Sequence, residues 1–222
     1  MAIVYGVNAS PFVRKVRVFM AEKGLPYELK PMLPFNVPAE YRKMSPLGKI
    51  PCYQDGNVTL PDSSVICAYL ERIHPRPELY PSDSHAYARA LWFEEYGDSG
   101  LAPTFGSKIF LPKIVAPRFF NQPADDAAIR KVAEEELPPL FDYLEGELGN
   151  GEGIVGNRFT IGDIGIATQF VNLRHAGFSP DPQRWPRLAG YLQRIHGRPS
   201  FKAVIEEEAR DLGLGAGTWA SA

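Results

Sequence analysis

The pattern of strand and helix signals changes once along this sequence, and that change constrains the fold more than any other feature. Short β-rich segments alternate with helical patterns up to about residue 74, and only helical patterns follow the proline-rich stretch 74–84. A small sheet covered by helices fits the first part, and a helical bundle fits the second. The sequence therefore predicts an α/β domain at 1–77 and an all-α domain at 85–222.

Within the first domain the predicted order is β-α-β, a loop, and then β-β-α. Ser10 and Pro11 suit the N-cap and first position of a helix, and Asp62-Ser63 opens another helix in the same way. Asp55-Gly56 is the strongest hairpin signal. The predicted strands are 3–7, 27–30, 50–53 and 57–60, and the predicted helices are 10–24 and 62–74, with one helical turn near Glu40.

The second domain shows helical periodicity throughout and no strand signal. Pro138-Pro139 is expected to kink or split one of its helices. The glycine-rich tail 213–222 is expected to be a frayed end, although Trp219 could fold back over a pocket. The predicted helices are about 84–101, 125–148, 160–176, 185–196 and 200–212.

Charge and cysteine content exclude several classes of function. The formal net charge is −2 and the pI is about 6.1, which gives nucleic acid or an anionic membrane little attraction. Cys52 and Cys67 are the only cysteines and lack metal-ligand spacing, so we expect no metal, no disulfide framework and a reducing, cytoplasmic location.

Three features of the first domain point to one ligand chemistry. Ser10 places a hydroxyl where a helix presents free N–H groups, a setting that stabilises an anion such as a thiolate. If the Ile50-Pro51 bond is cis, the turn exposes the main chain of Ile50 to an extended peptide. Asp62-Ser63 can bind the ammonium and carboxylate of an amino acid. Simple N-capping explains Ser10 and Asp62-Ser63 equally well.

In this order the motifs resemble those of the serine-type cytosolic glutathione S-transferases. SPFVRKVRVFMAEKG is similar to their first helix, SPLGKIP to their cis-proline turn, and LPDSSVICAYLE to their γ-glutamyl site. GNRFTIGDIGIA resembles the capping box of a central helix in their second domain, with Thr160 and Asp163 as partners. The resemblance runs from about residue 3 to about residue 212.

The resemblance implies a thioredoxin-like N-terminal domain followed by an all-helical C-terminal domain. It also implies an enzyme that uses glutathione as co-substrate and joins its thiolate to small apolar electrophiles. It implies that Ser10 stabilises the thiolate, that the main chain of Ile50 before Pro51 pairs with the peptide, and that Lys49 contacts the glycyl carboxylate. Asp62 and Ser63 hold the γ-glutamyl end by the same argument.

Tyr5 is a rival to Ser10, because other branches of the family use a tyrosine hydroxyl in the first strand. A packed strand aromatic is the other interpretation of Tyr5. The absence of a cysteine at position 10 argues against disulfide exchange with glutathione.

The electrophile pocket is expected between the domains, lined by Phe12 and by the helix that carries Tyr96 and Phe105. The alternatives are a non-catalytic binding or regulatory module with this fold, and a specialised glutathione-dependent peroxidase, isomerase or dehalogenase. The family resemblance also implies a homodimer.

Overall fold

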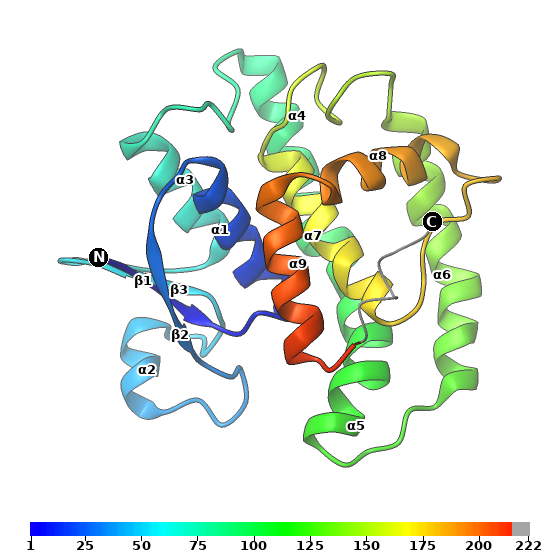
Figure 1. The fold of residues 1–222 in the computed structure, drawn as a ribbon, viewed down its shortest axis with the longest axis horizontal. Helices are drawn as coiled ribbons and strands as arrows, with labels where there is room; N and C mark the ends of the chain where they lie inside the picture. The colour runs from blue at the N-terminus through cyan, green and yellow to red at the C-terminus, as the bar shows by residue number, and fades with distance from the viewer. Residues whose placement is uncertain (215–222) are drawn as a thin grey trace. The chain divides into compact units, whose positions relative to one another are not determined.

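A computed structural model describes residues 1–214 of the protein (Figure 1). The chain forms two compact units. Unit 1 contains residues 1–80 and 199–213, and unit 2 contains residues 81–198. The predicted fold class, an α/β domain followed by an all-α domain, is confirmed. Trp219 and the rest of the tail after residue 214 lie outside the described residues.

A four-stranded mixed sheet forms the centre of unit 1, with strand order β2-β1-β3-β4. β1 pairs with β2 in parallel and with β3 in antiparallel register, and β3 pairs with β4 through a tight hairpin. Gly56 in that hairpin has φ +55°, which only glycine adopts without strain. The bounds are β1 (Ala2–Gly6), β2 (Tyr27–Pro31), β3 (Cys52–Asp55) and β4 (Val58–Pro61).

The helix α1 (Pro11–Glu22) lies deep inside unit 1, with eight consecutive buried residues from Val13 to Met20. It packs against the sheet, against α3 (Ser63–Ile73) and against α9 (Pro199–Asp211). Its approach to the sheet requires a glycine, because a Cβ at Gly6 would lie 2.3 Å from a methyl group of Val13. The short helix α2 (Ala39–Met44) extends the single turn expected near Glu40.

The position of α9 differs from the predicted domain organisation. The sequence analysis assigns 200–212 to the C-terminal domain, whereas α9 belongs to unit 1 and lies beside α1 (Figure 1). Ion pairs join the two helices, since Arg14 and Arg17 of α1 meet Glu208 and Glu207 of α9. Periodicity alone does not specify which surface a helix covers.

Helices form the whole of unit 2, and α7 is almost entirely buried among them. The predicted capping box is present, with Thr160 and Asp163 as its partners. The helices are α4 (Ser84–Glu95), η1 (Tyr96–Leu101), η2 (Pro103–Val115), α5 (Ala116–Phe119), α6 (Asp126–Glu147), α7 (Ile161–His175) and α8 (Pro186–His196).

The structure contradicts one sequence-based expectation about unit 2. The first helix does not end near Leu101 but continues through η1, η2 and α5 to Phe119. Prolines stand at positions 103, 112 and 117 of this run. The first two lie in the π-helical segment η2, whose wider hydrogen-bonding pattern accommodates rings that lack an N–H donor. The pair Pro138-Pro139 does not split α6, which runs unbroken through both residues.

The described part of the chain also bears on membrane insertion. Among residues 1–214, no helix combines the length and the apolar character that crossing a bilayer requires.

Candidate functional site

Strand register brings the three predicted motifs to one end of the sheet. Tyr5 of β1 pairs with Cys52 of β3, so the end of β1 lies beside the start of β3, where Pro51 stands. The end of β4 reaches the same place, and the Asp62 N–H donates to the Pro51 carbonyl at 3.4 Å. The turn that leads from β1 to Ser10 therefore begins next to Pro51 and Asp62.

Ser10 is the N-cap of α1, as the sequence predicts. Its backbone is extended (φ −77°, ψ 123°), and its Oγ accepts a hydrogen bond from the Val13 N–H at 3.4 Å. A serine hydroxyl that accepts through a lone pair keeps its own proton for donation. The site therefore combines an O–H donor with the positive end of a helix of 12 residues.

The Ile50-Pro51 peptide bond is cis, as the turn motif suggests. The turn before it is held by the Lys49 carbonyl, which accepts from the Tyr41 hydroxyl at 3.0 Å and from Ser45 Oγ at 2.8 Å. Ile50 is buried, yet neither its N–H nor its carbonyl has a hydrogen-bond partner within residues 1–214. Buried main-chain groups are seldom left unpaired, so this position suits a peptide ligand. The Lys49 side chain is exposed beside it.

Asp62 and Ser63 begin α3 with an unusual backbone. Asp62 has φ +104°, a region that non-glycine residues occupy at a cost and most often at functional sites. Its Oδ1 accepts from the N–H groups of Ser64 at 2.9 Å and Val65 at 3.1 Å. Ser63 is 3% exposed, and its hydroxyl makes no hydrogen bond within residues 1–214. The pair presents a carboxylate, a hydroxyl and helix N–H groups together.

Lys15 is a polar residue near this site that the sequence analysis missed. Its side chain is fully buried in α1, and its Nζ donates to Ser64 Oγ at 2.8 Å. The lysine therefore connects the helix of Ser10 with the first turn of α3. The sequence does contain a signal for a buried charge. Positions 14, 15 and 17 are all charged, so α1 cannot be buried on all sides without enclosing charged side chains.

Tyr5 points away from α1. Side chains alternate along a strand, and Gly6 faces Val13 of α1, so Tyr5 lies on the opposite face of the sheet. There its ring packs edge-on against Tyr41 with centroids 6.1 Å apart, and its hydroxyl donates to Gln54 Oε1 at 3.0 Å. These contacts agree with the interpretation of Tyr5 as a packed strand aromatic.

The residues expected to line a substrate pocket have different surroundings. Phe12 is half-buried in the first turn of α1. Tyr96 stacks against Tyr143 in unit 2 with ring centroids 4.8 Å apart, and burial raises its pKa to about 12. Phe105 is fully buried and packs edge-on against Phe141 and Phe170, so it is a core residue of unit 2.

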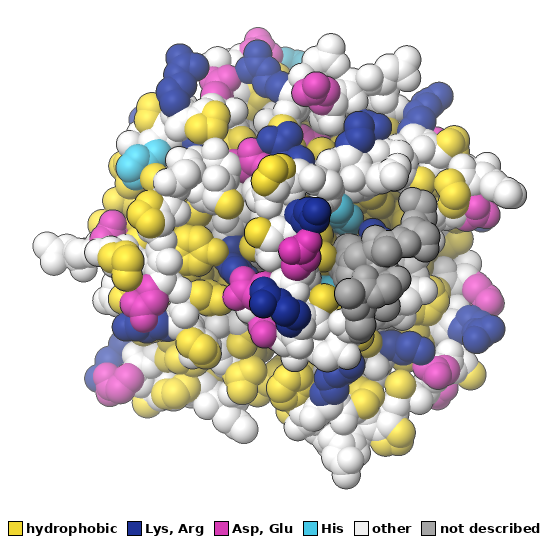
Figure 2. Space-filling view, viewed as in Figure 1, with side chains coloured by type: hydrophobic (Ala, Val, Ile, Leu, Met, Phe, Trp, Pro, Cys, Tyr) yellow, Lys and Arg dark blue, Asp and Glu magenta, His cyan; other side chains and the backbone are white. Residues whose placement is uncertain are grey.

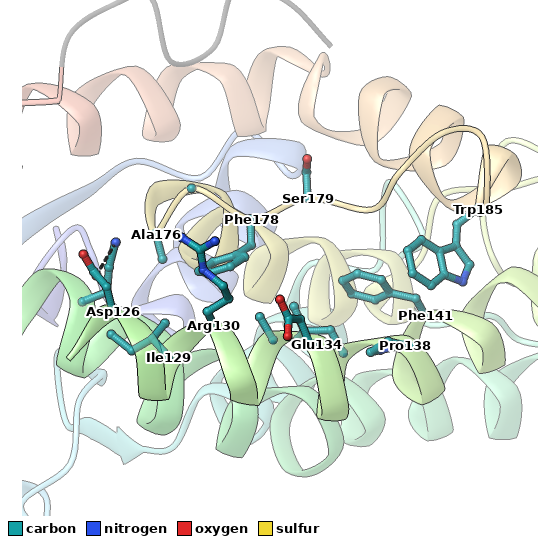
Figure 3. A pocket seen from close by; sticks show the side chains of 14 residues that line it. Asp126, Ile129, Arg130, Glu134, Pro138, Phe141, Ala176, Phe178, Ser179 and Trp185 are labelled. Carbon is teal, nitrogen blue, oxygen red and sulfur yellow. Dashed lines mark hydrogen bonds and ion pairs between the residues drawn. The ribbon is translucent and has the colours of Figure 1, made fainter. Parts of the chain in front are cut away.

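A separate cavity of about 600 Å³ lies wholly within unit 2 (Figure 3). It runs along α6 and is closed on the other side by the segment 176–185. Phe141 and Trp185 form an apolar end, whereas the Lys113–Asp126 ion pair, 2.7 Å long, forms a polar end. None of the predicted site residues lines it, so it is distinct from the site at the sheet edge.

Two family models match this chain, one in each unit. The family model for the glutathione S-transferase N-terminal domain matches residues 4–78, and the model for the glutathione S-transferase C-terminal domain matches residues 86–194.

Individual relatives are similar over most of their length. The chain is 27% identical to glutathione S-transferase DHAR3, chloroplastic, of Arabidopsis thaliana, over 86% of this chain and 67% of that protein. It is also 27% identical to glutathione S-transferase GstB of Escherichia coli strain K12, over 92% of this chain and 98% of the relative. A crystal structure of a glutathione S-transferase from Rhodospirillum rubrum superposes with a TM-score of 0.82 at 24% identity, covering 92% of this chain and 91% of that one.

The two family models together match most of both units, and the relatives carry the same family name. The chain belongs to the glutathione S-transferase family and is a glutathione transferase enzyme with glutathione as its co-substrate.

Proposed function

We propose that the enzyme conjugates the thiolate of glutathione to small apolar electrophiles and that Ser10 stabilises this thiolate. The observation that carries the proposal is the convergence of Ser10, the Ile50-Pro51 turn and Asp62-Ser63 at one end of the sheet. When bound, glutathione supplies a thiol whose ionised form is the nucleophile.

The proposed role of Ser10 is to shift that ionisation. A free thiol has a pKa of about 8.5, so only a few per cent is ionised at neutral pH. Lowering the pKa by about two units takes roughly 2.7 kcal/mol, which a charge-assisted hydrogen bond at a helix N-terminus can supply. Ser10 acts as a hydrogen-bond donor and neither accepts the thiol proton nor forms a covalent bond.

The other motif residues bind the peptide rather than the sulfur. The unpaired N–H and carbonyl of Ile50 suit an extended main chain, and the exposed Lys49 ammonium suits a terminal carboxylate. The Ser63 hydroxyl, at the N-terminus of α3, suits the γ-glutamyl carboxylate. The Asp62 carboxylate, which also accepts from the N–H groups of Ser64 and Val65, suits its ammonium. The Ile50 main chain and the Ser63 hydroxyl, which have no hydrogen-bond partner within residues 1–214, are groups that such a peptide would satisfy.

For the electrophile we keep Phe12 and Tyr96 as proposed contacts and omit Phe105, because its side chain is enclosed in the core of unit 2. Substituting Phe12 with alanine should raise KM for an apolar electrophile without changing the thiol pKa. A parallel rise in that pKa would place Phe12 in the thiolate site instead.

We also propose that the enzyme is a cytoplasmic homodimer with a role in detoxification. Apolar side chains on α3, among them Val65 and Ile73, are about half exposed and would be covered by a second copy. Light scattering at two protein concentrations should give the mass of two chains, and Val65→Asp should lower it towards the mass of one. A single-chain mass for the wild type would contradict the dimer.

The test of the catalytic assignment is a pH–rate profile with glutathione and a generic aryl halide. Ser10→Ala should raise the apparent thiol pKa in kcat/KM by about one to two units, since the donor is lost. Ser10→Thr keeps both the hydroxyl donor and the N-cap, so its profile should stay near that of the wild type. Tyr5→Phe should leave the profile unchanged. An unchanged profile in Ser10→Ala, with a raised pKa in Tyr5→Phe, would transfer the role to Tyr5.

A further inference from the structure

The turn that carries Ser10 is bound by side chains from the far end of the chain. Asn8 occupies this turn, between the end of β1 and the start of α1. Its Nδ2 donates to Glu207 Oε1 at 3.1 Å and to Asp211 Oδ2 at 2.5 Å, both on α9. Its Oδ1 accepts from Nη1 of Arg17. The amide of Asn8 thus has a partner for each of its two N–H groups and for its oxygen.

The groups that hold Asn8 are themselves fixed. Arg17 also donates to Glu207, and its Nε donates to the Tyr27 hydroxyl at 2.7 Å. Burial opposes the charged form of Glu207, but the hydrogen bonds and charge of Arg17, with the Asn8 hydrogen bond, outweigh it and lower its pKa. Glu207 therefore accepts from Asn8 as a carboxylate. Acidic and basic side chains lie next to one another over α9 on the face in Figure 2.

Only one residue, Ala9, separates Asn8 from Ser10 along the main chain. The Ser10 N–H donates to the Val7 carbonyl at 3.1 Å, which closes the turn around Asn8. With Asn8 held by α9 and the turn closed, the main chain of Ser10 has little freedom to rotate before α1 begins. A hydrogen bond to sulfur weakens steeply as its geometry departs from the optimum, so the position of this turn affects the strength of the Ser10 donor.

We propose that Asn8 is a positioning residue for Ser10 and that Glu207 and Asp211 of α9 hold it in place. The proposal rests on the function proposed for Ser10. It assigns to α9 a part in setting the thiol pKa, although no residue of α9 is needed to contact glutathione.

The chain provides a matched control for a general loosening of α9. Ser200 donates to Glu22 at the opposite end of the antiparallel α1–α9 pair, far along α1 from Ser10. Ser200→Ala removes one hydrogen bond between α1 and α9, whereas Asn8→Ala removes the two hydrogen bonds from the Ser10 turn to α9. Only Ser200→Ala leaves that turn intact. The two variants therefore separate positioning of Ser10 from attachment of the helix.

The experiment measures the pKa of the glutathione thiol bound to the full-length enzyme, by ultraviolet absorbance of the thiolate, together with the pH profile of kcat/KM. Asn8→Ala and Glu207→Ala should raise this pKa by about 0.5 to 1 unit, which lowers the thiolate fraction roughly threefold to tenfold on the acid side. Ser200→Ala should leave it unchanged. Melting temperatures of all variants are recorded to show that each is folded.

A double-mutant cycle separates this inference from the proposed function. If Asn8 acts through Ser10, Asn8→Ala should have no further effect on the thiol pKa in a Ser10→Ala background. A normal pKa in Ser10→Ala would overturn the function proposed for Ser10. Three other results would overturn the positioning role alone. The first is a pKa shift in Ser10→Ala with none in Asn8→Ala, and the second is an equal shift in Asn8→Ala and Ser200→Ala. The third is an additive shift in the double variant.

Discussion

Arg14 and Glu208 form a two-point ion pair in which both side chains are fully buried. Arg14 Nε donates to Glu208 Oε1 at 2.7 Å, and Nη2 donates to Oε2 at 2.5 Å. The pair joins α1 to α9 inside unit 1. The cost of removing two charges from water offsets much of their attraction, so the intact pair adds little net stability, whereas a single remaining charge would be strongly unfavourable.

Removing one partner of this pair should therefore destabilise the protein more than removing both. We expect Glu208→Ala to lower the free energy of unfolding by about 3–5 kcal/mol, and Arg14→Met combined with Glu208→Met to recover a large part of that loss. Urea denaturation of the three proteins measures this. The exposed Lys202–Glu206 pair on the same helix is the control, and its loss should cost less than about 1 kcal/mol. Equal losses at the two pairs would refute the prediction.

Close helix packing in unit 2 should make Gly97 intolerant of a side chain. A Cβ there would lie 2.4 Å from the Gly165 carbonyl oxygen, a backbone atom of α7 that has no flexible way to move. We expect Gly97→Ala to cost about 1–3 kcal/mol or more, as overpacking does. Gly106→Ala in η2 meets nothing within 4 Å, and it should be neutral or stabilise by up to about 1 kcal/mol. Thermal unfolding should show a lower melting temperature for Gly97→Ala and no decrease for Gly106→Ala, and similar decreases in both variants would argue against the close contact.

The elements that the sequence predicts well are those with local signals at their ends. Ser10, Asp62 and Thr160 begin α1, α3 and α7 as expected, because capping is determined within four residues. The continuation of the first helix of unit 2 to Phe119 was not predictable in this way. The prolines in this segment locally favour a break in the helix, and packing within unit 2 supports the π-helical segment instead.

The site was predicted where it depends on strand order and missed where it depends on distant pairs. A β-β hairpin that follows a β-α-β unit is enough to place Pro51 and Asp62 together. Asn8, in contrast, hydrogen-bonds to residues about 200 positions later in the chain. These residues lie in the run EEEARD, whose charges are typical of a solvent-exposed helix face. No local pattern links them, so α9 was assigned to the wrong unit and Asn8 was not singled out.

The capping box of α7 should contribute more to stability than an exposed N-cap. Asp163 is buried and accepts from the Ile154 N–H at 2.7 Å, the Thr160 N–H at 2.7 Å and the Tyr191 hydroxyl at 2.8 Å. Asp163→Ala leaves these donors without a partner, so we expect a loss of at least about 3 kcal/mol. Asp125→Ala, which removes the exposed cap of α6, should cost about 1 kcal/mol. Comparable losses in urea denaturation would contradict the buried network.

The buried thiol of Cys52 should make stability decline in alkali. Burial raises the pKa of Cys52 from 9.0 to about 11, so the folded protein retains this proton at a pH where the unfolded chain has lost it. The stabilisation is complete below pH 9 and is lost as the pH rises through 11, with a total of about 2–3 kcal/mol.

The measurement for Cys52 is the free energy of unfolding of the wild type and of Cys52→Ala between pH 8 and pH 10.5. The alanine variant has lost a thiol and gained a small cavity, which lowers its stability by an amount that does not depend on pH. Tyr53, whose pKa burial raises to about 12, is present in both proteins, so its contribution cancels in the difference. The wild type should therefore lose its advantage over Cys52→Ala as the pH rises above 9, whereas a constant difference would show that the thiol does not titrate in this range.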